Sequence, residues 1–498
     1  MRRRLGGVVM GVAIAAAPAA AQPPGVAEWR AAHERAIVEE LRGLVSLPNV
    51  AGNDADMRKN AEHLRSLFTA RTFTVETVDG PGSPVVFASL DVPDAAGTLT
   101  FYIHYDGQPV DPAEWTRCPP FAPCLFSATG PVPDDPSRTR FDPEWRLYGR
   151  SASDDKGPIV AFLNAVDALR ATGRGPTWNL RVVLDGEEEA GSRNFQRFAA
   201  ARAGALKSDL AVTLDGPRHP SGRPTVYFGV RGGAGVTLTV YGARGDLHSG
   251  NYGNWAPDPS MRLAKLLATM KDDAGRVLIK DFYRDVRPLT PTERAALEAA
   301  PNVEDRLARE FGVARPERPD ERLEVKLNQP TLSVLELSTS GISGRSAIPG
   351  SATARIEVRM VKDLVPETQN ALITEHVRAQ GYHVVTGREP TDEERRRHPL
   401  IARVDPRRGS AASRVSMDDP KAQAVVKALT MRGVPPVQLP TLGGGLPFGT
   451  FSDQYGMPTV GVSIVNFDNN QHGPDENLRL QNLWEGIEML AALMTLPK

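Results

Sequence analysis

The sequence contains few cysteines and no long hydrophobic run. Cys118 and Cys124 are the two cysteines among 498 residues, and two thiolates cannot complete a four-ligand structural zinc site. In an oxidising compartment the pair can form a local disulfide, and two free thiols are the alternative. No apolar segment reaches the roughly 20 residues that a membrane-spanning helix needs. We therefore expect no membrane span.

The sequence also lacks an excess of charge of either sign. Lys and Arg number 59, Asp and Glu number 60, and the formal net charge is -1. Because there is neither a basic stripe nor an aromatic-basic RNA motif, we expect no nucleic-acid partner. The glycine-rich segment Thr441–Pro447 lacks the Gly-Lys-Ser/Thr ending of a phosphate-binding loop.

The first 21 residues have the pattern of a secretory signal. Arg2–Arg4 precede the apolar run Val8–Ala17, and small residues follow at Ala19–Ala21. We expect residues 1–21 to be removed and the mature protein to be periplasmic or secreted. A disordered or packed N-terminal helix is the alternative.

Beyond the signal, the chain predicts two domains. In residues 22–222, strand-like segments at 98–104, 179–184 and 209–214 alternate with helical ones, which indicates a parallel sheet flanked by helices. Residues 223–370 show strand, helix, two strands and helix, which suggests a small inserted α+β domain. Residues 371–498 return to the first pattern and are expected to complete the first domain.

Candidate site residues follow the predicted strands. His104 ends the first strand, and Asp106 points to the same side because residues two apart share a face. Glu188 and Glu189 follow the second strand, and Asp215 follows the third. Carboxylates clustered beside a buried sheet need a compensating positive charge, which a divalent metal supplies.

Two more candidates lie in loops. Asp154 and Asp155 begin a helix, where one can cap the helix while the other binds a cation. His472 lies in a polar turn after the last predicted strand. The two imidazoles and three carboxylates of His104, Asp154, Glu189, Asp215 and His472 form a ligand set for a pair of borderline metals such as zinc.

Five strings in order resemble a known family, the co-catalytic zinc exopeptidases. This family includes carnosinase-like dipeptidases, glutamate carboxypeptidases, aminoacylases and succinyl-diaminopimelate desuccinylase. Asp-Asp-Lys-Gly-Pro and Asp-Leu-His-Ser-Gly are most similar to the dipeptidase branch. The resemblance implies an α/β catalytic domain with a mostly parallel central sheet and an inserted ferredoxin-like α+β dimerisation or lid domain. The strings are His104–Pro109, Leu147–Pro158, Asp185–Ser192, Asp246–Gly253 and Asn470–Asn477.

The resemblance implies a metal-binding role for five residues. His104, Asp154 and Asp215 are expected to bind one metal ion. Asp154 is expected to bridge to a second ion, which Glu189 and His472 complete, and the Asp154–Asp155 peptide is expected to be cis. The ions implied are Zn²⁺ in the first place, with Mn²⁺ or Co²⁺ as alternatives.

The resemblance also implies catalytic and binding roles. Glu188 is expected to be the general base that activates a bridging water, and Asp106 is expected to orient His104. His248 is expected to reach the partner's active site in a homodimer formed through the inserted domain, where it stabilises the oxyanion. Arg359 is expected to bind the carboxylate of the substrate.

The predicted activity is two-metal hydrolysis of a peptide bond in dipeptides or short peptides. Dipeptidases of the family carry Arg-x-Gly-Gly-Ser-Ile-Pro, whereas this chain has Thr441 and Gly445 in place of that arginine and serine. Backbone N–H groups of Gly444 and Gly445 can still face a carboxylate. The departures keep an N-acyl-amino-acid amidohydrolase open as the alternative. A non-catalytic binding protein would be expected to lose ligands or the base, and all are present.

Overall fold

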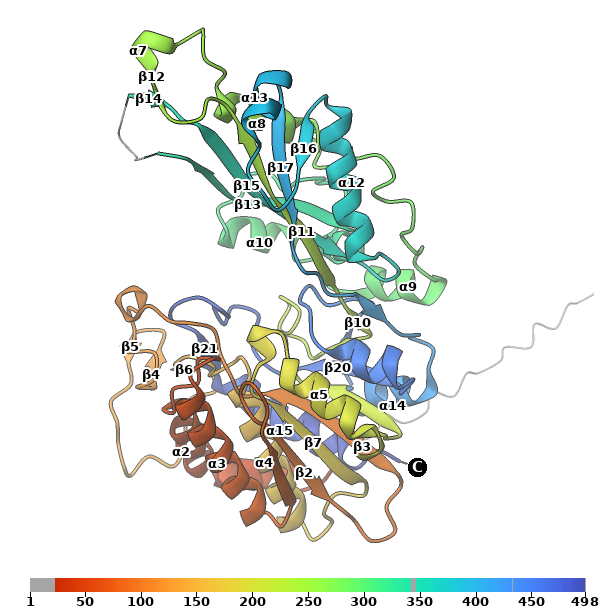
Figure 1. Cartoon of the computed structure of the whole chain (residues 1–498). Coiled ribbons are helices and arrows are strands. Elements are labelled where there is room, and N and C mark those ends of the chain that lie inside the picture. Colours follow the sequence, from red (N-terminus) through yellow and green to blue (C-terminus); the bar gives the residue numbers. More distant parts are fainter. Residues whose placement is uncertain (1–22, 342–345, 432, 498) are drawn as a thin grey trace, which may run out of the picture.

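The computed structural model describes residues 23–341, 346–431 and 433–497, which form two domains (Figure 1). The predicted signal, residues 1–21, lies outside this range. Within the described ranges, no helix is both long and apolar enough to cross a membrane.

The first domain is built on an eight-stranded mixed sheet with the order β1-β2-β7-β3-β8-β20-β9-β19. Its centre, β7-β3-β8-β20, is parallel, as predicted. All four central strands are largely buried because helices cover both faces. The strands are β1 (Thr74–Val78), β2 (Val85–Leu90), β3 (Thr98–His104), β7 (Asn179–Asp185), β8 (Leu210–Thr213), β9 (Thr225–Tyr227), β19 (Val437–Leu439) and β20 (Thr459–Ser463).

Two hydrophobic clusters sandwich this sheet. The larger cluster packs α4 and α15 against one face, and α4 is buried around nearly its whole circumference because other helices cover it in turn. The smaller cluster packs α5 against the other face through Phe195 and Phe198. The helices are α1 (Val26–Ala32), α2 (Glu34–Val45), α3 (Asp54–Ala70), α4 (Lys156–Ala171), α5 (Arg193–Ala201), α6 (Ala203–Leu206), α14 (Pro420–Ala428) and α15 (Leu480–Leu493).

The proline-rich segment between β3 and α4 is an ordered insertion. Its strands β4, β5 and β6 form a four-stranded sheet with β21 from the C-terminal part of the chain, in the order β21-β6-β4-β5, and Cys118 and Cys124 are joined in a disulfide. Of the two alternatives that the sequence left open, the structure therefore contains the bridged pair. The strands are β4 (Cys124–Ser127), β5 (Gly130–Pro131), β6 (Arg146–Tyr148) and β21 (Asn477–Arg479).

The second domain is a five-stranded sheet with the order β13-β15-β11-β17-β16. Leaving aside the edge strand β16, the chain order β11-α8-β13-β15-α12-β17 is the predicted ferredoxin-like arrangement. Alternate residues of β15 are buried, because α8 and α12 cover one face and leave the other open. The elements are β11 (Gly232–Tyr241), α8 (Pro259–Ala268), β13 (Thr331–Thr339), β15 (Ser351–Met360), α12 (Pro366–Ala379), β16 (His383–Val385), α13 (Asp392–Arg397) and β17 (Ile401–Pro406).

The second domain differs from its predicted bounds of 223–370. Residue 370 falls inside α12, and β16 and β17 beyond it still pair within the five-stranded sheet. These short strands lie on either side of residues 388–398, which are mostly charged. The charged residues made the strand pattern on either side difficult to recognise in the sequence. Conversely, α9 lies against β19 of the first domain. The remaining elements are β10 (Gly229–Val230), β12 (Leu247–His248), α7 (Ser249–Tyr252), α9 (Pro291–Ala299), α10 (Glu304–Glu310), α11 (Leu323–Leu327), β14 (Ala347–Ile348) and β18 (Ser413–Arg414), with short single turns at Pro112–Glu114, Glu188–Ala190 and Thr450–Gln454.

Candidate active site

The polar side chains that follow the central strands meet at one edge of the sheet. His104 is the last residue of β3, Asp215 lies two residues after β8, and Glu188 and Glu189 begin the short turn after β7. These three strands are parallel neighbours, so their carboxyl ends lie together. The sequence therefore predicted correctly where these side chains gather.

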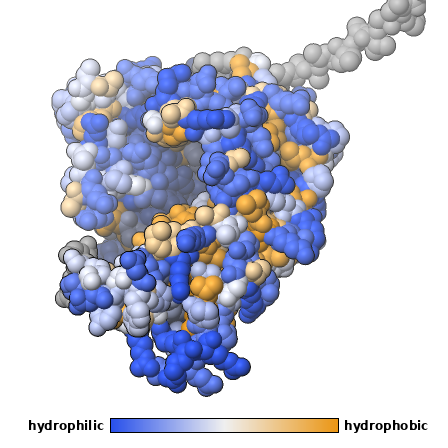
Figure 2. Space-filling view, turned by 90° about the horizontal axis from the view of Figure 1, so that it is seen from above, coloured by the Kyte–Doolittle hydropathy of each residue, from blue (hydrophilic) through white to orange (hydrophobic). Residues whose placement is uncertain are grey.

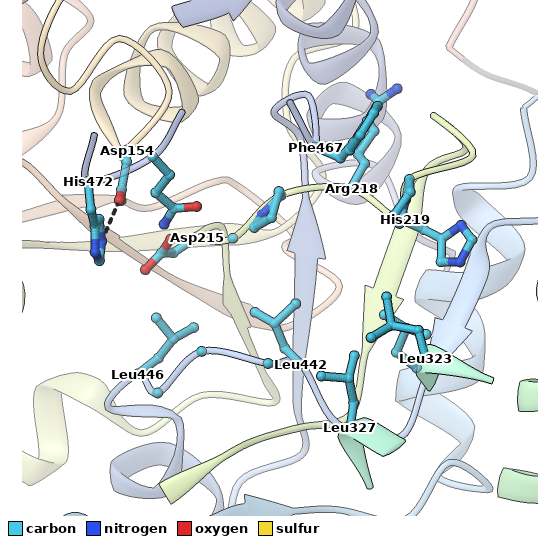
Figure 3. Close-up of a pocket in the computed structure, with 18 of the residues that line it drawn as sticks. Asp154, Asp215, Arg218, His219, Leu323, Leu327, Leu442, Leu446, Phe467 and His472 are labelled. Atoms are coloured by element: carbon cyan, nitrogen blue, oxygen red, sulfur yellow. Dashed lines mark ion pairs between the residues drawn. The ribbon is translucent and has the colours of Figure 1, made fainter. Parts of the chain in front are cut away.

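The predicted ligands form two adjoining groups. His104, Glu188 and Asp215 offer atoms within 4.8 Å of one another, and so do Asp154, Glu189 and His472. Asp154 links the groups, because its Oδ1 lies 2.7 Å from His104 Nε2 and its Oδ2 lies 3.1 Å from His472 Nε2. Figure 3 shows Asp154, Asp215 and His472 facing one another at one end of a cavity.

Burial makes this cluster of acids electrostatically costly. Burial, with the neighbouring Asp154 carboxylate, raises the pKa of Asp215 to about 7 and that of Glu189 to about 7. Burial also raises the pKa of Glu188 well above its ordinary value. The acids thus cannot all hold negative charge at neutral pH without a compensating cation.

Divalent metal ions fit these residues. Each group combines an imidazole nitrogen with carboxylate oxygens, which is the ligand chemistry of zinc and similar ions. His472 Nε2 also lies 3.3 Å from Glu189 Oε2. His104 is fully buried and His472 is half exposed, so the two groups differ in their access to solvent.

Asp106 supports the group formed by His104, Glu188 and Asp215 from the side opposite Asp154. Its Oδ1 lies 3.3 Å from His104 Nδ1, the nitrogen on the far side from Asp154. Its two carboxylate oxygens also accept hydrogen bonds from the backbone N–H groups of Glu188 at 3.0 Å and Glu189 at 3.1 Å. One buried carboxylate therefore orients an imidazole and the turn that carries both glutamates.

The loop before α4 presents Asp154 through a cis Asp154–Asp155 peptide bond. Asp155 is the N-cap residue of α4, but its side chain makes no capping hydrogen bond. The prediction that one of the two aspartates caps the helix is therefore wrong for Asp155. Asp155 Oδ2 instead accepts a hydrogen bond from the backbone N–H of His104 at 3.4 Å. The side chain thus ties the loop to β3.

Glu476 organises the same loop, and sequence reasoning missed it. Its buried carboxylate accepts hydrogen bonds from the backbone N–H groups of Ser151, Ser153 and Asp154, from the Ser153 hydroxyl and from Arg150. The signal was its place four residues after His472, within one of the matching strings. A single side chain therefore fixes the backbone of Asp154 and binds it to the loop of His472.

Of the other predicted site residues, three line the cavity that contains the candidate ligands, and one lies outside it. Arg359, Gly444 and Gly445 line the same cavity as the candidate ligands. Arg359 lies on β15, on the face that the helices leave open. His248 is exposed on β12 and is not among the described residues that line this cavity. Gln108, which the sequence did not single out, donates to Glu189 Oε2 at 2.7 Å.

Paired ligand groups at the carboxyl ends of parallel strands are the arrangement of a two-metal enzyme site. The model of peptidase family M20/M25/M40 matches residues 100–496. The chain belongs to this family and is a metallopeptidase, as its sequence resemblance implied.

Three similar proteins illustrate the match. Cys-Gly metallodipeptidase dug1 of Schizosaccharomyces pombe is 27% identical over 68% of this chain and 72% of its own length. The human Beta-Ala-His dipeptidase is 26% identical over 83% of this chain and 77% of its own length. The structure of an M20 family metallo-carboxypeptidase of Sulfolobus solfataricus superposes with a TM-score of 0.72 at 26% identity, covering 92% of this chain and 98% of that one.

Glu476→Gln is expected to weaken metal binding about 10-fold to 100-fold, the usual effect of removing a partner behind a ligand. An amide has one acceptor oxygen, so it cannot hold the Ser151, Asp154 and Arg150 donors together. The measurement is metal content and competitive chelation, with the exposed Glu62→Gln as the matched control. Unchanged metal affinity in Glu476→Gln would contradict the role.

Proposed function

We propose that this protein hydrolyses the peptide bond of dipeptides or short peptides with two divalent metal ions, zinc in the first place and Mn²⁺ or Co²⁺ as alternatives. The observation that carries the proposal is the pair of ligand groups joined by Asp154 in a cavity that also contains Arg359. Two of the similar proteins are named dipeptidases, which favours this substrate class over N-acyl amino acids.

His104, Asp154 and Asp215 would hold one ion, and Asp154, Glu189 and His472 the other. When bound, such ions make water acidic and polarise the carbonyl to be cleaved. Burial raises the pKa of Glu188, and a raised pKa suits a carboxylate that must take up and release a proton. Glu188 takes the proton of the attacking water on its carboxylate and delivers it to the nitrogen of the leaving amine.

The substrate is expected to be held at its carboxylate. Arg359 pairs with Glu357 of the same strand face at 3.1 Å and keeps 41% of its side chain exposed. Gly444 and Gly445 lie in the same cavity, where their backbone can approach an anion without a side chain in between. Thr441 is buried, which leaves the guanidinium of Arg359 as the carboxylate's anchor.

Glu188→Gln is expected to lower kcat at least about 100-fold, since a positioned general base contributes on that scale. The substitution keeps the size of the side chain, so two metal ions should stay bound and KM should change little. The measurement is hydrolysis of dipeptides, tripeptides and N-acyl amino acids by metal-loaded protein, together with metal content. Loss of one ion would make Glu188 a ligand, because it lies with His104 and Asp215. Release of N-acyl groups alone would move the enzyme to the amidohydrolase class.

We propose in addition that the protein is a homodimer through the second domain. β13 is an edge strand of its sheet, and Val334, Leu335 and Leu337 on it are 40%, 45% and 65% exposed. Figure 2, which looks down on the second domain, shows apolar patches within a mainly hydrophilic surface. An exposed apolar edge strand is a surface on which a second copy can pair. His248, exposed on the same domain, would then complete the partner's site.

Mixing Glu188→Gln with His248→Ala tests the shared site. Each variant alone should be nearly inactive. A mixed dimer has one site with both defects and one intact site, so random exchange at equal amounts should restore about a quarter of wild-type activity. Activity of the mixture equal to the mean of the two variants, or a fully active monomer in sedimentation, would contradict the proposal.

We propose that the protein is exported, because residues 1–21 have the pattern of a signal and the Cys118–Cys124 disulfide suits an oxidising compartment. N-terminal sequencing of the native protein should show a mature chain that begins at Gln22 in the periplasmic or secreted fraction. A native chain that still begins at Met1 would contradict it.

A further inference from the structure

The cavity that contains the candidate ligands extends well beyond them. Its volume is about 670 Å³, and the acidic residues occupy one end (Figure 3). The remaining wall is mostly apolar, although Arg218, His219 and Glu324 also line it. Its apolar residues include Leu307, Leu323, Leu327, Leu442, Leu446 and Phe467.

Part of this wall comes from the segment 290–328, which the sequence shows as a charged stretch between two strands of the second domain. Leu323 and Leu327 lie on α11 and Leu307 lies on α10. Leu323 and Leu327 are four residues apart and therefore share one face of α11, which lines the cavity; Glu324 of the same helix also lines it and is paired with His219.

The segment is fastened to the first domain, so the wall is part of the folded site. Glu324 of α11 accepts at 2.8 Å from His219, which follows β8. The Arg306 guanidinium lies 4.5 Å from the centre of the Phe467 ring. At the other end of the segment, Arg414 pairs with the buried Glu293 at 3.2 Å.

Arg359 and the loop Gly443–Gly445, which we expect to bind the substrate's carboxylate, lie next to the apolar wall. Leu442 and Leu446 flank the loop Gly443–Gly445, and Arg359 lines the same cavity. In a peptide, the terminal carboxylate and the last side chain are bonded to one Cα atom. A carboxylate held by Arg359 and this loop therefore brings the last side chain within reach of the leucines.

We propose that this enzyme selects substrates whose C-terminal residue has a large apolar side chain, such as leucine or phenylalanine. The inference rests on the proposed function and names the substrate class of that site. Burial of the side chain against Leu323, Leu327 and Leu442 removes apolar surface from water, which supplies the preference. The charged cavity groups His219 and Arg218 are paired with Glu324 and Glu485, so they do not favour a charged side chain.

The first test compares kcat/KM for Ala-Gly, Ala-Ala, Ala-Leu and Ala-Phe, and for Leu-Ala as the reversed sequence. Ala-Leu should exceed Ala-Ala by about tenfold or more, the discrimination that an apolar pocket gives for added methylenes, and it should exceed Leu-Ala. Equal rates across the Ala-X series, or a preference for Leu-Ala, would overturn the inference and leave the proposed function intact. Failure to hydrolyse any of these peptides would instead overturn the proposed function.

The second test uses Leu327→Ala and the matched control Leu278→Ala, whose side chain is 50% exposed and lies outside this cavity. Leu327→Ala should lower the ratio of kcat/KM for Ala-Leu to that for Ala-Gly by about fivefold or more, and the control should not change it. A ratio is unaffected by the fraction of folded protein. An unchanged ratio in Leu327→Ala would overturn the assignment of this wall to the C-terminal side chain.

Discussion

The structure depends on how it holds several buried acids within reach of one another. His104, Asp154, Asp215 and the two glutamates converge at the end of a sheet where water is largely excluded. Burial, and after it the repulsion from Asp154, raises the pKa values of Asp215 and Glu189. Such a cluster persists only if its backbone is fixed and its charge is compensated. Metal ions compensate the charge, and the surrounding carboxylates fix the backbone.

Two buried carboxylates outside the two ligand groups, those of Asp106 and Glu476, fix the backbone. Asp106 accepts from the turn that bears Glu188 and Glu189. Glu476 accepts from the loop that bears Asp154. Because both accept from backbone N–H groups, each fixes the position of the chain in addition to the side chains that it contacts. The ligands from β3, β7, β8 and the distant His472 loop can therefore be preorganised before any ion binds.

The sequence predicted the sites that follow buried strands, because a run of apolar residues that ends in a carboxylate marks a strand end. It could not predict from spacing that His472 would approach Asp154, since 318 positions separate them along the chain and only their similarity to family strings joined them. It also missed the wall at Leu323 and Leu327, because two short helices in a charged stretch carry too few apolar residues to indicate what they cover. The end of the second domain was misplaced because β16 and β17 are short and lie on either side of the dense charge run 388–398.

The departures from the family's glycine-rich motif gain a physical meaning from these positions. Thr441, which replaces the family's arginine, is uncharged and buried, so this position supplies neither a charge nor an exposed side chain. A Cβ atom at Gly445 would lie 3.0 Å from the Arg231 carbonyl oxygen, which is closer than side chains usually approach, whereas Gly444 has open space. The chain thus removes polar side chains from this loop while it places Leu442 and Leu446 beside it. The two replacements remove a guanidinium and a serine hydroxyl from this loop, while Leu446 stands at the position where the family motif has isoleucine.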